Sequence, residues 1–158
     1  QKIIKPEKFF ESVAGEFINN LYLNNFAFLM PDNKGAFITR YATKNKINLN
    51  KNEIKFLLGK LNNKIIYPEN IFKKRRIKPI QKILLIKIKW KIEFYQIYAL
   101  MPLYSENKLI GLIIFADKSE KKYFLKKHKF LKILKIEIER ILFSILLYNQ
   151  AISRMIKK

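Results

Sequence analysis

The feature that most constrains this chain is a helical pattern over residues 125–157 that is apolar on two faces. One set of apolar residues, here called the heptad seam, advances in alternating steps of three and four. It comprises Leu131, Leu134, Ile138, Ile141, Ile145, Tyr148, Ile152 and Met155. A second face carries Phe130, Ile133, Phe143, Leu146 and Leu147. A helix with two apolar faces must bury both. We therefore expect one face to cover a core and the heptad seam to pair with a second copy of the chain. A helix wholly buried within one chain is the alternative.

Two strands are predicted before this helix, over residues 97–104 and 108–118. The three residues Ser-Glu-Asn between them indicate a tight hairpin loop. The segment 109–116 is apolar at nearly every position, so we expect this strand at the centre of a sheet that is covered on both faces. Pro102 has no N–H group to donate, which predicts an irregular point in the first strand.

The N-terminal half begins with an amphipathic helix over residues 6–22, with Pro6 in its first turn. Strands over 25–30 and 36–42 follow, and the Pro-Asp-Asn-Lys-Gly run between them predicts a β-hairpin. Because side chains alternate along a strand, three residues of the second strand are expected on one face. These are Phe37, Thr39 and Tyr41.

The middle of the chain is harder to interpret. Asn50 can cap a short helix over 51–61, and a short extended piece interrupted by Pro68 follows. The segment 77–95 supports two interpretations. Alternation of large apolar residues with charged ones favours a strand, whereas Leu84, Leu85, Ile88, Ile92 and Tyr95 would share one face of a helix. The spacing of the apolar residues, taken alone, favours the strand.

Length and composition predict one globular domain over residues 1–158, with a core over about 6–150. Residues 150–158 are expected to begin a connecting helix toward an output domain. The chain has no Cys, so disulfides, thiolate metal sites and Cys nucleophiles are excluded, and a reducing cytoplasm is the expected location. No apolar run approaches the roughly 20 residues that a membrane span needs.

The net charge of +21 has two interpretations. The charge can favour binding to nucleic acid or to an anionic membrane surface. Alternatively, it reflects a Lys-rich and Asn-rich composition without function. Only five of the 33 basic residues are Arg, the residue that phosphate and base recognition favours. We therefore treat a basic nucleic-acid-associated protein as the alternative function, with the run Lys73, Lys74, Arg75 and Arg76 as its contact site.

Several motifs in the C-terminal half resemble those of GAF domains. They are Met101-Pro102-Leu103, Leu109-Ile110-Gly111-Leu112, Lys118-Ser119, Phe124 and Tyr148-Asn149. The resemblance is specific over about 98–150, consistent over 6–60 and poor over 62–96. It implies an α+β, PAS-related fold with a central antiparallel sheet of five to six strands. The N- and C-terminal helices would pack on one face, and short helices and loops would roof a ligand pocket on the other. It also implies a helix over 78–93.

GAF domains are regulatory modules that bind cyclic nucleotides, bilins, haem, amino acids or small metabolites, or that dimerise without a known ligand. The absence of Cys argues against bilin attachment and against methionine sulfoxide reduction. The cyclic-nucleotide signature has no convincing counterpart. We therefore expect a sensory domain that dimerises and relays a signal to an output domain, without enzymatic activity, metal or cofactor.

The resemblance gives candidate pocket-lining residues for a small ligand. They are Phe37, Thr39, Tyr41, Phe56, Tyr67, Phe72, Tyr98 and Leu100. The alternative is that these large side chains fill the space themselves. No pair of carboxylates suggests acid–base catalysis. His128, the only histidine, lies among lysines and is expected on the solvent-exposed surface.

Overall fold

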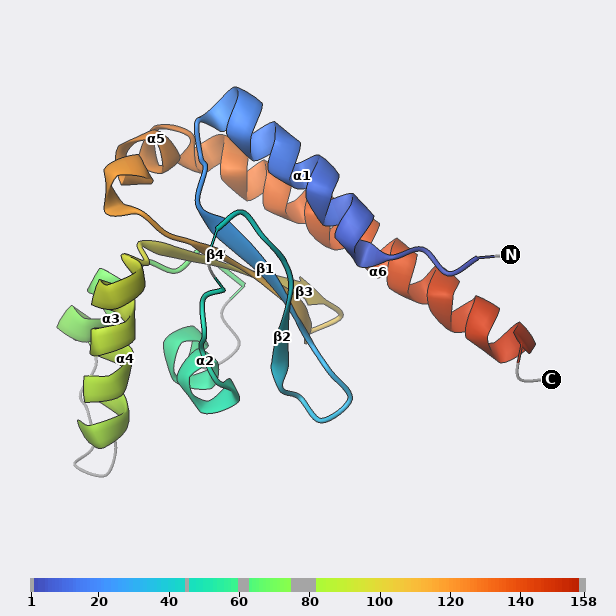
Figure 1. Ribbon diagram of the computed structural model, residues 1–158, viewed down its shortest axis with the longest axis horizontal. Helices are drawn as coiled ribbons and strands as arrows, with labels where there is room; N and C mark the ends of the chain where they lie inside the picture. Colours follow the sequence, from blue (N-terminus) through green and yellow to red (C-terminus); the bar gives the residue numbers. More distant parts are fainter. Residues whose placement is uncertain (1, 45, 60–62, 75–81, 157–158) are drawn as a thin grey trace.

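The computed structural model describes residues 2–44, 46–59, 63–74 and 82–156. A four-stranded antiparallel sheet lies between two layers of helices (Figure 1). The strand order is β2-β1-β4-β3, with β1 Phe26–Pro31, β2 Phe37–Ala42, β3 Ala99–Ser105 and β4 Lys108–Phe115. The α+β class is as expected, but the prediction of five to six strands is wrong.

The sheet stops at β3 because the chain beside it turns into a helix. Ile66 and Leu100 exchange two backbone hydrogen bonds of 2.8 Å, which form an isolated bridge. Two residues later Pro68 begins α3 (Pro68–Lys74), and proline suits the first turn of a helix. Pro102, two residues after Leu100, would direct its missing N–H to the same edge, so β3 cannot extend this pairing. The predicted fifth strand is therefore reduced to one bridge within the described residues.

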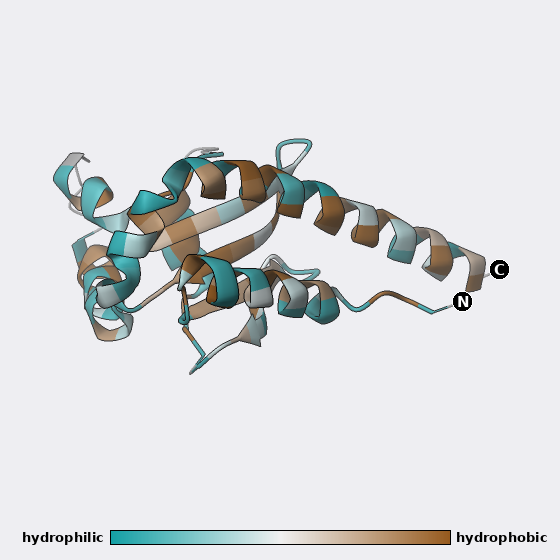
Figure 2. Ribbon diagram, turned by 90° about the horizontal axis from the view of Figure 1, so that it is seen from above, coloured by the Kyte–Doolittle hydropathy of each residue, from teal (hydrophilic) through white to brown (hydrophobic). Residues whose placement is uncertain are grey.

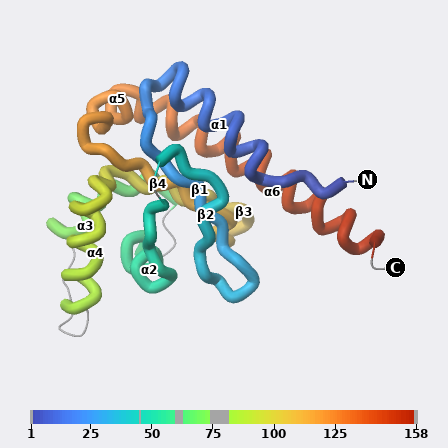
Figure 3. The backbone as a smooth tube through the Cα atoms, viewed as in Figure 1, coloured from blue at the N-terminus to red at the C-terminus, as the bar shows by residue number. Residues whose placement is uncertain are grey.

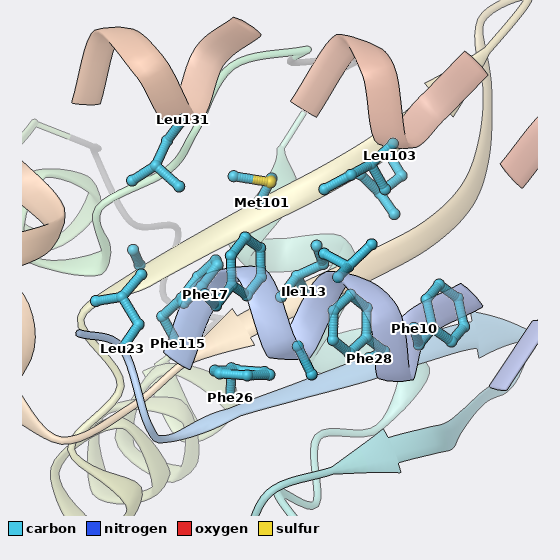
Figure 4. Close-up of a cluster of buried hydrophobic side chains, with 14 of the residues drawn as sticks. Phe10, Phe17, Leu23, Phe26, Phe28, Met101, Leu103, Ile113, Phe115 and Leu131 are labelled. Carbon is cyan, nitrogen blue, oxygen red and sulfur yellow. The ribbon is translucent and has the colours of Figure 1, made fainter. Parts of the chain in front are cut away.

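The terminal helices α1 (Pro6–Leu21) and α6 (His128–Ile156) cover one face of the sheet, as the resemblance implied. Between them and the strands lies an aromatic core (Figure 4). Phe10 stacks on Phe28 with ring centroids 4.6 Å apart, and Phe17 meets the edge of Phe26 at 5.1 Å. Such aromatic pairs add about 0.5–1.5 kcal/mol each beyond the area they bury.

The opposite face is covered by α2 (Lys51–Leu58), by α4 (Lys82–Tyr95) and by the loop before α2. The tube in Figure 3 follows the chain from β2 through this loop into α2. Asn50 caps α2 as predicted, because its side chain accepts from the Glu53 N–H and the Glu53 carboxylate accepts from the Asn50 N–H, each at 2.8 Å. The same carboxylate accepts from Lys91 Nζ of α4 at 2.7 Å, which ties the two helices together.

Residues 82–95 form a helix, so the helix that the resemblance implied is confirmed over 82–93 and the period-two argument was wrong. Residues 78–81 of that expected helix lie outside the described residues. Leu85, Ile88 and Ile92 are buried against the sheet at helical spacing. Of the alternating apolar residues that suggested a strand, Ile86, Trp90 and Phe94 lie on the opposite, exposed side of the helix. Alternation in the sequence thus arose from a helix that is apolar on two sides rather than from a strand.

Two short helical turns connect β4 to α6. These are the 3-10 turn η2 (Lys118–Glu120) and α5 (Lys121–Lys126). The hairpin between β3 and β4 turns at Glu106 and Asn107, whose φ angles are 51° and 64°. Two consecutive residues with positive φ are typical of the I′ turns that suit the twist of a hairpin.

Gly111 in β4 lets α6 approach the sheet. A Cβ at this position would lie 3.1 Å from a Leu103 methyl carbon, 3.4 Å from a Leu142 methyl carbon of α6 and 3.4 Å from the Leu29 carbonyl oxygen. A side chain here would therefore push against α6, which explains the glycine in the Leu-Ile-Gly-Leu motif.

We expect Gly111→Val to lower the free energy of unfolding by about 1–3 kcal/mol, because the added methyl groups overpack the space beneath α6. Urea denaturation measures this change. Gly15→Ala is the matched control, since nothing lies within 4 Å of the added methyl and alanine favours helix α1. It should raise stability by about 0.5–1 kcal/mol. Equal stability of the valine variant and the wild type would contradict the close approach.

Candidate functional site

The face expected to hold a ligand pocket is filled by side chains. Leu29, Leu100, Leu112 and Ile114 of the sheet are buried beneath α2 and α4. Ile54, Leu57, Ile88 and Ile92 of these helices complete the contact. At the centre of this face, the space expected for a ligand is therefore occupied by side chains, as the alternative interpretation stated.

The eight candidate lining residues lie on both faces of the sheet. Phe37, Phe56, Phe72 and Leu100 belong to the core beneath α2 and α4. By contrast, Tyr41, Tyr67 and Tyr98 belong to the aromatic core beneath α1 and α6. Thr39 pairs with Leu29, a residue of the first core. The structure therefore does not bring the eight residues together in one pocket.

A β-bulge explains why Tyr41 leaves the predicted face. Phe28 pairs with Tyr41 and Leu29 pairs with Thr39, so Arg40 is an extra residue in β2. One extra residue reverses the alternation of all side chains beyond it. Tyr41 therefore packs edge-on against Phe28 at 6.0 Å, on the side of the terminal helices. Arg40 forms an ion pair with Glu7 of α1 on that side.

A surface pocket of about 360 Å³ lies at the edge of α2, beside the turns of the two hairpins. Its apolar part is formed by Phe37, Ile54, Leu58 and Leu109, and Lys51 and Lys55 bring two ammonium groups from successive turns of α2. Of the eight candidates, Phe37 is the one that lines this pocket. An apolar floor with two cationic groups suits a small organic anion.

A neighbouring pocket extends from the same residues to α6. It measures about 590 Å³ and shares Gly35, Phe37 and Leu109 with the first pocket. Its other side is lined by Met30 of β1, Ile110 of β4 and Leu146 of α6. This second pocket therefore connects the hairpin ends to α6. A third pocket, of about 400 Å³, lies at the opposite end of the strands and includes Lys44, Gln96 and Asp117.

A buried polar cluster fixes the connection between β4 and α6. Glu120 accepts hydrogen bonds from the Asn24 N–H at 2.8 Å and from the Asn25 side-chain amide at 2.8 Å. The Asn25 amide also donates to Asp117 at 3.1 Å. Because these groups are satisfied by one another, the cluster is best explained as a structural junction.

His128 is half-buried rather than exposed, which corrects the sequence-based expectation. Its Nδ1 lies 2.6 Å from the Tyr67 hydroxyl, within hydrogen-bond distance. Burial raises the pKa of Tyr67 to about 12. The pair joins the segment before α3 to the first turn of α6. No sequence signal connected these two residues, which are 61 positions apart.

Tyr98 is buried, and among the described residues its hydroxyl has no hydrogen-bond partner. Burial raises the pKa of this hydroxyl, and the nearby carboxylates of Glu120 and Asp117 add to the shift. A buried polar group without a partner costs about 1–3 kcal/mol.

We expect Tyr98→Phe to raise the free energy of unfolding by about 1 kcal/mol, because it removes an unsatisfied hydroxyl and keeps the ring. Tyr67→Phe is the matched change at a hydroxyl that contacts His128, and it should lower stability by about 1 kcal/mol. Thermal and urea denaturation of both variants measure the difference. A loss of stability in Tyr98→Phe as large as that in Tyr67→Phe would mean that the Tyr98 hydroxyl is bonded.

An ion pair on the inner side of α6 connects this helix to β3. Lys135 and Glu139 lie one turn apart, 2.7 Å from Nζ to carboxylate, and both are buried. Glu139 also accepts from the Tyr104 N–H at 2.6 Å, and Lys135 donates to the Asn63 side chain at 2.5 Å. Removing one partner of such a pair leaves a buried charge, at a cost of about 3–5 kcal/mol. The sequence pattern offered only an i, i+4 spacing of opposite charges.

The heptad seam is divided between the interior and the surface of the chain. Leu131, Ile138, Ile145 and Ile152 are buried within the chain itself. Leu134 and Ile141 are half-buried, whereas Tyr148 and Met155 are exposed. Half of the seam therefore packs inside the chain, and a second copy could contact only the other half.

Seven large apolar side chains of α6 are exposed, and we call them the outer face of α6. They are Phe130, Ile133, Ile136, Leu147, Tyr148, Met155 and Ile156. Ile133, Ile136 and Leu147 lie within about 60° of one another around the helix axis at 3.6 residues per turn. Figure 2 shows apolar and polar residues along α6, which extends past the sheet.

The basic run is only partly described. Lys73 and Lys74 end α3, and Lys73 is exposed, whereas Arg75 and Arg76 lie outside the described residues. Among the helices of the described part of the chain, none combines the length and the apolar character needed to cross a bilayer.

Comparisons with known proteins find little similarity. No family model and no curated protein matches the chain. One solved structure is similar, described as "the domain of putative two-component sensor histidine kinase protein from Sinorhizobium meliloti 1021". It is 20% identical, with a TM-score of 0.44, and the match covers 94% of this chain and 91% of that chain.

Proposed function

We propose that this chain is a regulatory domain that pairs two copies through α6 and relays a signal along that helix. The observation that carries the proposal is the outer face of α6, where Ile133 and Ile136 are 63% and 62% exposed. Large apolar side chains exposed on one side of a helix are typical of a surface that another helix covers, and here the exposed ion pair between Glu137 and Arg140 lies between Ile136 and Leu147. The proposed interface therefore differs from the predicted one: it uses the exposed side of α6 in place of the heptad seam, half of which is buried within the chain.

The dimensions of α6 support a relay. The helix has 29 residues and is therefore about 43 Å long. Its C-terminal part extends past the sheet, alongside the N-terminal segment (Figure 3). Asn149 accepts from the Ile4 N–H and donates to the Ile4 carbonyl, both at 2.8 Å, so its side chain pairs with this segment as a neighbouring strand would. A movement of α6 would therefore carry both ends of the chain with it.

A route from the small-ligand pocket to α6 also supports a relay. Tyr104 and Leu109, near the β3–β4 turn, line the pocket beside Lys51 and Lys55. The Tyr104 N–H donates to Glu139 of α6, so this hairpin end is bonded directly to the helix. A small organic anion between Lys51 and the hairpin would bias the position of Glu139 and hence of α6.

We expect Ile133→Glu combined with Ile136→Glu to shift the chain from dimer to monomer at micromolar concentration, because two charges would enter the apolar contact. Sedimentation equilibrium measures the change. Ile38→Glu is the control, since Ile38 is also exposed but lies on β2. A wild-type chain that is monomeric over the whole micromolar range would refute the proposal, as would an equal effect of the control.

A further inference from the structure

Helix α4 carries a second exposed apolar surface, distinct from the outer face of α6. Four large side chains form it, here called the outer stripe of α4: Ile83, Ile86, Trp90 and Phe94. Each is between 61% and 72% exposed. Their spacing of three, four and four residues places them on one side of the helix, along about 16 Å of its length. Trp90 and Phe94 stack with ring centroids 5.1 Å apart.

The opposite side of α4 is already occupied, so the outer stripe is not needed for the fold. Leu85, Ile88 and Ile92 pack against the sheet and α2. Lys91, beside the stripe, is held by Glu53 of α2 at 2.7 Å, which fixes the rotation of the helix. The outer stripe therefore faces away from the core in a defined orientation.

Lysines outnumber acidic residues beside the stripe. Lys82, Lys87 and Lys89 are exposed on the same helix, and so is Glu93, the one acidic residue of α4. The ammonium group of Lys89 lies 5.4 Å from the Phe72 ring centroid of α3. The whole chain has a net charge of +21. An apolar side with Trp and Phe, bordered by Lys, is the pattern of helices that lie in the interface of an anionic membrane.

We propose that the outer stripe of α4 docks on an anionic lipid surface, with Trp90 and Phe94 inserted at the level of the headgroups. Aromatic rings of this kind favour the membrane–water interface. The apolar side chains stand on a single helix rather than in a groove, which suits a flat lipid surface. The lysines beside them complement anionic headgroups. This inference concerns a different helix from the proposed dimer and does not depend on it.

The chain offers a direct probe, because Trp90 is its only tryptophan. We expect its fluorescence emission to shift to shorter wavelength with vesicles of equimolar phosphatidylserine and phosphatidylcholine, and the chain to sediment with them. Vesicles of phosphatidylcholine alone should give little of either. Raising salt to 1 M, where the Debye length is about 3 Å, should weaken the binding.

A pair of matched variants separates insertion from charge. Ile83→Ser combined with Ile86→Ser leaves Trp90 and Phe94 in place and should weaken vesicle binding about tenfold, because it removes half of the apolar stripe. Ile38→Ser combined with Leu125→Ser removes two exposed aliphatic side chains elsewhere and should leave binding unchanged. Circular dichroism checks that both variants remain folded.

Three results would overturn the proposal. One is sedimentation with anionic vesicles while Trp90 emission stays fixed, since that describes adsorption of a cationic protein without insertion. Another is an equal loss of binding in the Ile38 and Leu125 variant. The third is a shift of Trp90 emission with rising protein concentration in the absence of lipid, which would assign the stripe to a second copy of the chain.

Discussion

The structure depends on the burial of β4 on both of its faces. Leu112 and Ile114 pack beneath α2 and α4, while Ile113 and Phe115 belong to the aromatic core beneath the terminal helices. A strand in this position needs a partner strand on each side and a helical layer on each face. Gly111 extends the same constraint to α6, because it lets the helix approach the strand closely.

Local signals in the sequence predicted most elements, and long-range details escaped them. The Asn50 cap, the hairpin turns and the terminal helices were predictable because neighbouring residues determine them. The face of Tyr41 was not, since a one-residue bulge in β2 reverses it. Helix α4 was ambiguous because its two apolar sides imitate alternation. The Tyr67–His128 contact joins residues whose proximity only the tertiary fold creates.

The candidate site was the least predictable part. The resemblance placed a ligand at the centre of the sheet face, yet Leu100 and its neighbours fill that region with aliphatic side chains. On this face, space remains at the hairpin ends, where Lys51 and Lys55 border Phe37. Glu139, bonded to Tyr104 beside this space, links it to α6. Exposed apolar surfaces lie on α6 and on α4, helices that the sequence periodicity could not divide into inner and outer faces.

The central claim is that two copies meet along the outer side of α6, and spin-label distances test it most directly. Because the chain has no Cys, Ser144→Cys introduces a single labelling site, three residues before Leu147 on the exposed side of the helix. Helices in contact lie about 8–10 Å apart, so double electron–electron resonance should find label separations below about 25 Å. A resonance signal that shows only the smooth decay of unpaired labels, or only label separations above this range, would contradict the account.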